Sequence, residues 1–339
     1  MTSHRYRMPA EWEPHSRCWM AWPCRESLWG DGLDDARRAY AEVATTIAAF
    51  EPVTMITRPD LTANASLALG KGVRILPLDH DDSWTRDTCP TFVHDTQTGV
   101  VAGVDWRFNG WGNVYEQITN DKAMAGRITG HLGMERIASS LTTEGGAIHC
   151  DGEGTALLCT GSVLDPNRNP QWTRDRVEAE LARTLGIDRT IWLEHGLTDD
   201  ETAGHVDNIA CFAAPGKVIT LDPGTAGNAD RPGLEANLRA LADSIDAAGR
   251  NIEVITLPVP TARKRSNGAK LTRSYINFYI ANGAIVMPAF DDYADSTARK
   301  RLQSCFPEHE IIQIEADCIL EGGGGIHCIT QQQPSPVEG

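Results

Sequence analysis

The chain has 339 residues, of which 41% are hydrophobic and 23% are charged, and its formal net charge is −15. This is the composition of a globular protein that is large enough to build a core without disulfide support. An acidic balance of this size, without a basic run, argues against nucleic acid as a partner. It suits a small cationic ligand, although acidic surfaces also serve solubility alone.

The nine cysteines are an odd number without regular spacing, which argues against a disulfide framework. Residues 1–16 are polar and lack the apolar core of a signal peptide. No stretch approaches the roughly 20 apolar residues that a membrane span requires. We therefore expect a soluble cytoplasmic protein that has no membrane partner.

In chain order, a helical pattern covers residues 34–50 and a strand is expected at 73–78. Hairpins follow, because two β-rich runs flank a Gly-containing turn in each of four segments: 91–104, 146–159, 206–221 and 275–288. Further helices are predicted at 174–185 and 233–248, and further strands at 190–193, 252–257 and 311–314.

The order hairpin, helix, strand recurs at intervals of roughly 55–70 residues. This period is longer than that of common solenoid repeats, but it likewise indicates a repeated structural unit. About five such units fit the chain. The sequence therefore predicts an α/β fold made of five repeated units, in one domain over residues 1–339. A polar tail is expected from about residue 331 to 339.

Ionisable residues stand at the heads of the hairpins: Asp87 before the first, Glu144 before the second and His205 before the third. Cys328 falls in the last apparent strand. If the units close into a ring, these residues meet in one central polar pocket. The alternative is that they are ordinary polar residues at strand ends.

Cys328 follows four successive glycines, residues 322–325, which would let the backbone approach a ligand closely and offer N–H donors. A lone cysteine in a strand is more often a small buried hydrophobic residue. Cys150 competes for the role, because Ile-His-Cys ends at both Cys150 and Cys328. Spacing alone does not choose between them.

His205 and Asp207 would share one face of a strand, since side chains alternate there. Such a pair suits general acid–base catalysis or a metal. Segment 81–87 is dense in charge and contains Trp84, so it is a candidate cation site with carboxylates and an indole face. The alternative for this segment is a solvated loop.

Taken together, these motifs resemble the agmatine deiminase family, which shares its fold with bacterial peptidylarginine deiminases and, more remotely, with arginine deiminases and amidinotransferases. The matching segments run in the family's order along nearly the whole chain: 19–23, 82–87, 106–109, 144–149, 204–208 and 322–332. The resemblance implies the pentein fold, a five-bladed pseudo-symmetric α/β propeller, which agrees with the five repeated units.

Carried over residue by residue, the resemblance implies a cysteine nucleophile, Cys328, with His205 as acid and base. It implies that Asp87 and Asp207 hold the guanidinium and that Glu144 supports His205 or the substrate. The implied substrate-binding residues are Trp84, Glu201 at the distal amine, Gly323 and Gly324. No metal and no organic cofactor is implied, the partner is a small cationic guanidino compound, and a homodimer is one assembly that this interpretation allows.

The sequence departs from the family pattern at four positions: Cys89, Asn113, Ala203 and Gly325. None of them replaces the nucleophile, the histidine or the aspartates. They lie beside the expected site, so they leave open which guanidino compound is the substrate.

The first hypothesis is therefore hydrolysis of agmatine to N-carbamoylputrescine and ammonia, a step towards putrescine and the polyamines. A close variant acts on another guanidino compound, such as peptidyl or free arginine. A second class is a metal-dependent hydrolase that uses His205, Asp207, Glu144 and His149, although no compact metal-ligand motif is present. A third is a guanidine-binding relative without catalysis.

Overall fold

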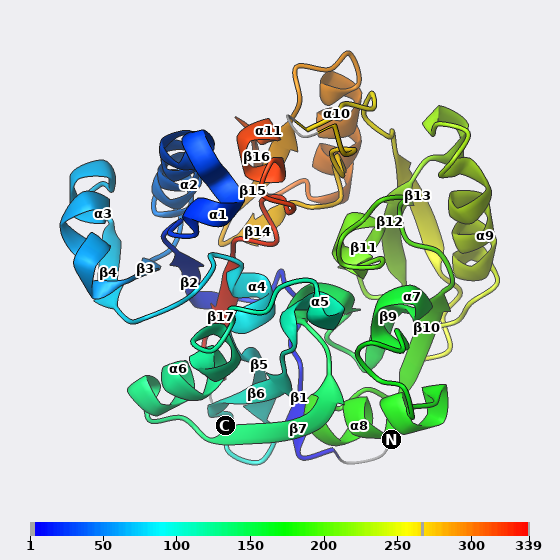
Figure 1. The fold of residues 1–339 in the computed structure, drawn as a ribbon. Coiled ribbons are helices and arrows are strands. Elements are labelled where there is room, and N and C mark those ends of the chain that lie inside the picture. Colours follow the sequence, from blue (N-terminus) through cyan, green and yellow to red (C-terminus); the bar gives the residue numbers. More distant parts are fainter. Residues whose placement is uncertain (1–3, 266–267, 338–339) are drawn as a thin grey trace.

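The structure of the protein, a computed structural model, describes residues 4–265 and 268–337. Its strands form five sheets that surround a common centre, with the longer helices on the outside (Figure 1). The strands are β1 (Tyr6–Arg7), β2 (His15–Ala21), β3 (Val53–Thr57), β4 (Val73–Pro77), β5 (Thr91–Asp95), β6 (Val101–Arg107), β7 (Arg136–Thr142), β8 (Ile148–Cys150), β9 (Thr155–Cys159), β10 (Arg189–Leu193), β11 (Ala210–Ala214), β12 (Lys217–Leu221), β13 (Glu253–Leu257), β14 (Tyr279–Ala281), β15 (Ala284–Ala289), β16 (Glu310–Glu315) and β17 (Gln331–Pro334).

One pairing scheme recurs in every sheet. A short first strand pairs antiparallel with a second strand, which pairs in parallel with a third: β5–β6–β7, β8–β9–β10, β11–β12–β13, β14–β15–β16 and β17–β2–β3. The first and last sheets gain an extra strand, β1 beside β5 and β4 beside β3. The predicted repeat of hairpin, helix and strand is therefore confirmed, and with it the five-unit pentein architecture.

The parallel step in each unit requires a crossover, and a helix supplies it because its apolar stripe covers the sheet. In chain order the crossover helices are α2 (Leu33–Ile47), α6 (Met124–Leu132), α8 (Arg174–Leu185), α9 (Arg231–Ala242) and α10 (Asp295–Cys305). A further helix, α3 (Thr62–Ala68), connects β3 to β4, and short helices complete the chain: α1 (Glu26–Trp29), α4 (Thr85–Thr88), α5 (Gly110–Asn113), α7 (Thr160–Val163) and α11 (Asp317–Leu320). Among the described helices, none combines the length and the apolar character that crossing a bilayer needs.

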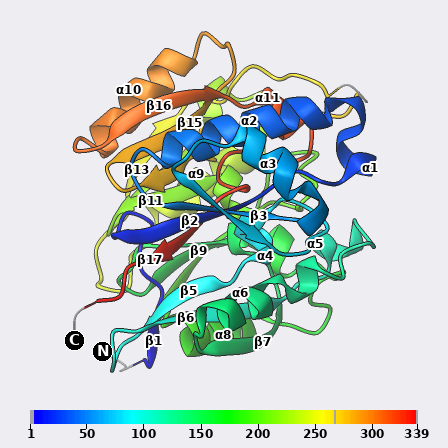
Figure 2. The ribbon, with the colours of Figure 1, turned by 90° about the vertical axis from the view of Figure 1, so that its left-hand side faces the viewer.

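The ring closes where the two ends of the chain meet. Gln331 to Pro334, predicted as the start of a polar tail, form the buried strand β17, which pairs antiparallel with β2 (Figure 2). The fifth unit therefore takes its first strand from the C-terminal region and its other strands from the N-terminal region. Residues 338–339 of the predicted tail lie outside the described part of the chain.

Two local predictions were wrong. Cys328 lies in a turn just before β17 and not in a strand, because the four glycines and the following turn precede the strand. His205 and Asp207 do not alternate along a strand either, since Val206–Asn208 form a 3₁₀ turn that precedes β11. In both cases the residues lie in the turn that precedes the first strand of their unit.

Candidate active site

The heads of the hairpins meet at the centre of the ring, as the repeat predicts. Asp87 belongs to α4, just before β5, and Glu144 precedes the 3₁₀ turn Gly145–Ala147 that leads into β8. His205 and Asp207 lie shortly before β11, and Cys328 precedes β17. Four units of the ring therefore bring their ionisable side chains into one place, although these residues span most of the sequence.

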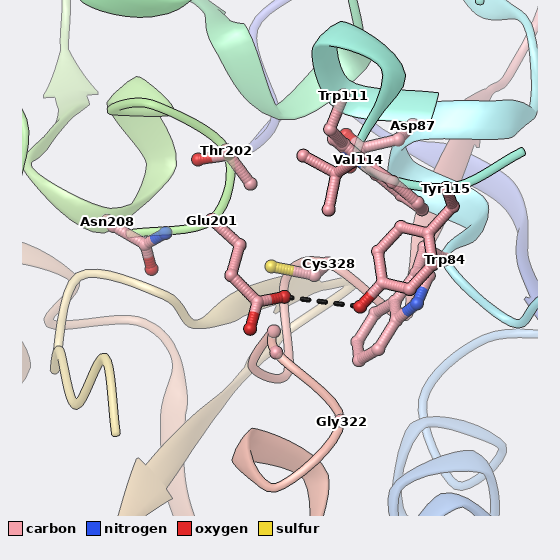
Figure 3. A pocket seen from close by; sticks show the side chains of 12 residues that line it. Trp84, Asp87, Trp111, Val114, Tyr115, Glu201, Thr202, Asn208, Gly322 and Cys328 are labelled. Carbon is pink, nitrogen blue, oxygen red and sulfur yellow. Dashed lines mark hydrogen bonds between the residues drawn. The ribbon is translucent and has the colours of Figure 1, made fainter. Parts of the chain in front are cut away.

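A cavity with an empty volume of about 410 Å³ opens onto this place (Figure 3). Three aromatic side chains, Trp84, Trp111 and Tyr115, form part of its wall. The remaining lining residues are Asp87, Val114, Glu201, Thr202, Asn208, Gly322, Gly323, Gly324 and Cys328. Aromatic faces beside carboxylates form a site that suits a flat organic cation.

His205 is buried among carboxylates. Its Nε2 lies 3.2 Å from Oε2 of Glu144, and its Nδ1 lies 3.8 Å from Oδ1 of Asp87. Burial by itself would lower the pKa of His205, but Asp87, Glu144 and Asp207 outweigh it and raise the pKa to about 9. The imidazole is therefore protonated at neutral pH and ready to act as an acid.

Glu144 is held in turn by Arg168, whose Nε lies 2.9 Å from its Oε1. Burial opposes ionisation of Glu144, but the Arg168 guanidinium and His205 keep its pKa below the usual value. Glu144 is therefore a carboxylate that orients His205 and holds its charge.

Asp87 accepts hydrogen bonds from Nε1 of Trp111 at 2.8 Å and from the backbone N–H of Gly146 at 3.0 Å. Burial raises its pKa, and the neighbouring charges of Glu144 and Asp207 act in the same direction, against the effect of His205. A bound cation between these carboxylates would relieve that repulsion.

Asp207 has one oxygen fixed and one available. Nδ1 of His327 lies 2.9 Å from its Oδ2, whereas Oδ1 is buried and has no hydrogen-bond partner among the residues that the structure describes. Despite burial, His327 and His205 lower the pKa of Asp207. The free oxygen is a ready acceptor for a substrate N–H group.

Cys328 is 7% exposed, and its Sγ lies 3.6 Å from Oδ2 of Asp207. Burial raises the pKa of the thiol well above its ordinary value, and the charges of Asp207 and Asp87 raise it further. A cation bound between these two carboxylates would reverse that electrostatic effect and favour the thiolate.

Glycines make the close approaches at this site possible. A Cβ on Gly146 would lie 2.7 Å from Nδ1 of His205, and one on Gly324 would lie 2.6 Å from the Trp84 ring. Gly323 has a φ of +112°, which other residues rarely adopt, and a Cβ there would lie 3.0 Å from Oε2 of Glu201. The Gly-rich segment thus follows the pocket wall, as predicted for Gly323 and Gly324.

The structure separates the two candidate cysteines that the sequence could not. Sγ of Cys150 donates to the carbonyls of Met8 and Pro9 at 3.5 and 3.4 Å. Cys150 is fully buried in a hydrophobic cluster and does not line the cavity. The difference between the two cysteines is therefore access, since Cys328 lines the cavity and Cys150 does not.

His149 does not join His205, Asp207 and Glu144, as the metal hypothesis would require. Its Nδ1 accepts from the backbone N–H of Phe212, and its Nε2 faces Glu11 at 3.7 Å. The described residues include no group of three or more His, Cys, Asp or Glu side chains arranged to hold a metal ion.

The acidic segment 81–87 is not one charged edge. Asp81 caps residues 120 and 121, and Asp82 pairs with Arg25 at 3.0 Å. Only Trp84 and Asp87 of this segment reach the cavity. The other carboxylates of the segment do not line the cavity, so the predicted cation site is reduced to Trp84 and Asp87 and stays a prediction for these two.

Glu201 lies at the outer part of the cavity and faces Tyr115, whose hydroxyl donates to its Oε2 at 3.3 Å (Figure 3). Its other oxygen pairs with Arg265, which is largely buried. A carboxylate and the Cys328 thiol thus line the same cavity. The four departures from the family pattern, Cys89, Asn113, Ala203 and Gly325, are not among the lining residues.

Several residues of the site were missed by sequence reasoning: Glu11, Trp111, Tyr115, Arg168, Asn277 and His327. Their partners at the site are other side chains at least 24 positions away, which a linear sequence does not show. Asn277 alone could have been predicted by the rule of hairpin heads, since it lies just before the first strand of the fourth hairpin. His327 could have been noted because it precedes Cys328.

Comparison with known proteins agrees with this geometry. The family model described as Porphyromonas-type peptidyl-arginine deiminase matches residues 7–334. Agmatine deiminase of Pseudomonas aeruginosa is 42% identical over 98% of this chain and 96% of its own, and a Legionella pneumophila protein provisionally named an agmatine deiminase is 46% identical over 97% and 95%. The solved structure of agmatine deiminase of Enterococcus faecalis superposes with a TM-score of 0.94 at 30% identity, over 99% of both chains.

These matches cover almost the whole chain, including every hairpin head that lines the cavity. The family and the fold that the motifs suggest are therefore both confirmed. The chain belongs to the Porphyromonas-type peptidyl-arginine deiminase family of the pentein superfamily, whose members include agmatine deiminases.

Proposed function

We propose that the protein is an agmatine deiminase, which hydrolyses agmatine to N-carbamoylputrescine and ammonia through a covalent thiouronium on Cys328. The observation that carries the proposal is a pair of buried carboxylates at Cys328: Asp87 lines the same aromatic-walled cavity, and Oδ2 of Asp207 lies 3.6 Å from Sγ. The relatives named as agmatine deiminases, at 41–46% identity, support the choice of substrate.

A guanidinium is planar and remains charged at physiological pH. Two carboxylates localise its charge through paired hydrogen bonds and fix its plane. In this proposal Asp87 and Asp207 hold the group, and Oδ1 of Asp207 accepts one of its N–H bonds. The bound cation neutralises the two charges that hold the Cys328 proton, so the thiol loses its proton to solvent.

The thiolate attacks the guanidinium carbon and forms a C–S bond. His205, protonated because of its raised pKa, gives its proton to the departing nitrogen, and the C–N bond breaks to leave ammonia and a thiouronium. Neutral His205 then takes a proton from water. The hydroxide adds to the carbon, and the C–S bond breaks to restore the thiolate. The ureido product loses the hydroxyl proton, and the released ammonia takes up one proton, so the overall products are the ureido compound and ammonium.

The distal end of the substrate distinguishes agmatine from arginine, because agmatine has a primary ammonium and no carboxylate. Glu201 is the carboxylate at that end of the cavity, and Tyr115 and the aromatic wall enclose the carbon chain between. A second amine charge therefore fits the site better than a carboxylate does. A cytoplasmic location and a homodimer remain predictions from the sequence.

The test compares Cys328→Ala with Cys150→Ala on a panel of agmatine, free arginine, a peptide with a C-terminal arginine and other guanidino amines. Ammonia and the ureido product are measured together. We expect Cys328→Ala to abolish turnover, Cys150→Ala to retain it, and agmatine to give the highest kcat/KM.

Three outcomes would contradict the proposal. Full activity in Cys328→Ala would remove the nucleophile, and binding of agmatine without turnover in the intact protein would favour a guanidine-binding relative. Loss of activity on chelation, with no loss on thiol alkylation, would favour the metal-dependent hydrolase.

A further inference from the structure

The fourth unit of the ring has its own residue at the head of its first strand. Asn277 lies two residues before β14, as Cys328 lies shortly before β17 and His205 and Asp207 lie shortly before β11. Its side chain is 2% exposed. Asp87 and Glu144 occupy the corresponding place in the other two units, so all five units direct a polar side chain to the centre.

The amide of Asn277 contacts the sulfur atom of the candidate nucleophile. Its Nδ2 lies 3.3 Å from Sγ of Cys328 and donates to Oδ1 of Asn208 at 3.1 Å. Its Oδ1 accepts the backbone N–H of His327 at 3.0 Å. Oδ1 also lies 3.5 Å from Sγ and can accept from the neutral thiol. A thiolate has no proton to donate, so the amino group is the end of the amide that can bond the charged sulfur.

The neighbouring glycine lets the amide come this close. A Cβ on Gly325 would lie 2.4 Å from Oδ1 of Asn277, a distance that real side chains do not show. The backbone at Gly325 therefore leaves space that the Asn277 amide fills. Since the amide is also bonded to His327 and Asn208, it has little freedom to turn away from Cys328.

We propose that Asn277 is a further catalytic residue, whose side-chain amide donates a hydrogen bond to the Cys328 thiolate. The inference rests on Cys328 being the nucleophile of the proposed reaction. The thiolate is present before the C–S bond forms and again when water has displaced it. A buried donor aimed at the sulfur stabilises the charge in both states, and it is preorganised because its own bonds fix it.

The electrostatics of the pocket agree with this role. Burial and the charges of Asp207 and Asp87 raise the pKa of Cys328, whereas the hydrogen bonds from Asn277 and from the backbone of Gly325 lower it. Two acidic side chains thus oppose the thiolate, and two N–H donors favour it. The donors are needed in the free enzyme, where no substrate cation offsets the carboxylates.

The test measures the rate at which iodoacetamide alkylates Cys328 in the full chain as a function of pH, without substrate, with the modified peptide identified by mass spectrometry. We expect Asn277→Ala to slow alkylation at fixed pH by about tenfold or more, as for loss of a hydrogen bond to a charged group, and to move the inflection to higher pH. Asn277→Asp keeps the side-chain volume, and we expect a larger shift because it replaces a donor with a carboxylate.

The matched control is Asn237→Ala. Asn237 lies in α9 and is also almost fully buried. Its side-chain amide forms hydrogen bonds with the backbone of His195, and it does not line the cavity. Its alkylation profile should coincide with that of the unmodified protein. Thermal unfolding of each variant checks the fold, and Asn277→Asp carries the test if Asn277→Ala does not fold.

An alkylation profile of Asn277→Asp that coincides with that of the unmodified protein would overturn the inference. So would a fall in kcat for Asn277→Ala with no change in the profile, because that result assigns the residue a structural role. The proposed function fails by a different result, full deiminase activity in Cys328→Ala, which does not depend on the alkylation of Cys328.

Discussion

Nε2 of His205 lies 3.2 Å from Oε2 of Glu144, and the opposite side of that carboxylate is held by Arg168. Two residues that are 61 positions apart thus form a buried pair, and the Arg168 guanidinium stabilises the negative charge of Glu144. Burial alone would keep His205 neutral, but the charges of Asp87, Glu144 and Asp207 together raise its pKa to about 9, so it is protonated at neutral pH.

Substitution of Glu144 tests this relationship. Glu144→Gln keeps the volume but removes the charge, so the pKa of His205 falls and less of it is protonated at neutral pH. We expect kcat/KM for agmatine to fall about 100-fold, within the range for general acid–base groups. The falling limb of the pH profile, expected near pH 9 in the unmodified protein, should move to lower pH. Glu180→Gln, on the half-exposed side of α8, is the control and should leave the limb in place.

Gly146 tests how tightly the centre is packed. A Cβ there would lie 2.7, 2.9 and 3.0 Å from atoms of His205, Asp207 and Asp87, so Gly146→Ala must displace at least one of them. A misplacement of this kind costs on the order of 100-fold in rate, and we expect such a loss in kcat measured by ammonia release.

Gly130→Ala is the matched control for Gly146→Ala. Gly130 is in α6, and nothing lies within 4 Å of an added Cβ. We expect unchanged kcat and a gain in stability of up to about 1 kcal/mol, because alanine is the better helix former. Unchanged kcat in Gly146→Ala would contradict the geometry of the centre.

Glu201 tests the distal amine. We expect Glu201→Gln to raise KM for agmatine about tenfold, the effect of one charge-assisted hydrogen bond, with a small change in kcat. Propylguanidine, which lacks the amine, should show no such change in KM between the two proteins. An equal rise in KM for both compounds would show that Glu201 shapes the pocket without recognising the amine.

Glu11 tests the buried charges beneath the site. It contacts Arg86 at 3.1 Å and His327 at 3.0 Å, and these partners, with His149, keep its pKa well below the usual value despite burial. Because its pKa is depressed in the folded state, its stabilisation is present above the unfolded value of 4.5 and is lost as pH falls through the folded pKa.

We therefore expect Glu11→Gln to lose about 3 kcal/mol or more of unfolding free energy at pH 7, the cost of leaving a buried charge without its partner. The variant should also lose less stability than the unmodified protein as pH falls below 4.5. Urea unfolding at several pH values measures both effects. An equal loss of unfolding free energy below pH 4.5 in the two proteins would contradict a lowered pKa of Glu11.

Much of the fold could be read from local patterns. Helix α8 has the predicted bounds, because its apolar spacing, its N-cap Thr173 and the left-handed Gly186 at its C-cap are all local signals. Each of the four predicted hairpins is present, since Gly-containing turns between β-rich runs specify them. The elements that were not predicted include helices α3, α6 and α10 and strands β2, β3 and β7.

The fifth unit shows where local patterns fail. Strand β17 is polar in composition and reads as a tail, and it is buried only because β2 pairs with it across more than 300 residues. Such a pairing has no local sequence signal, since the hydrogen bonds of the backbone, and not the side chains, define it.

By itself, the sequence determined the five repeated units and the residue types at their heads, because periodicity and turn chemistry are local. It named Asp87, Glu144, His205, Asp207 and Cys328 as the candidates. Only the tertiary structure decided that Cys328 and not Cys150 lines the cavity, since the two share one motif and differ in what surrounds them. It also decided the charge state of His205, which depends on carboxylates that the closed ring brings together from three different units.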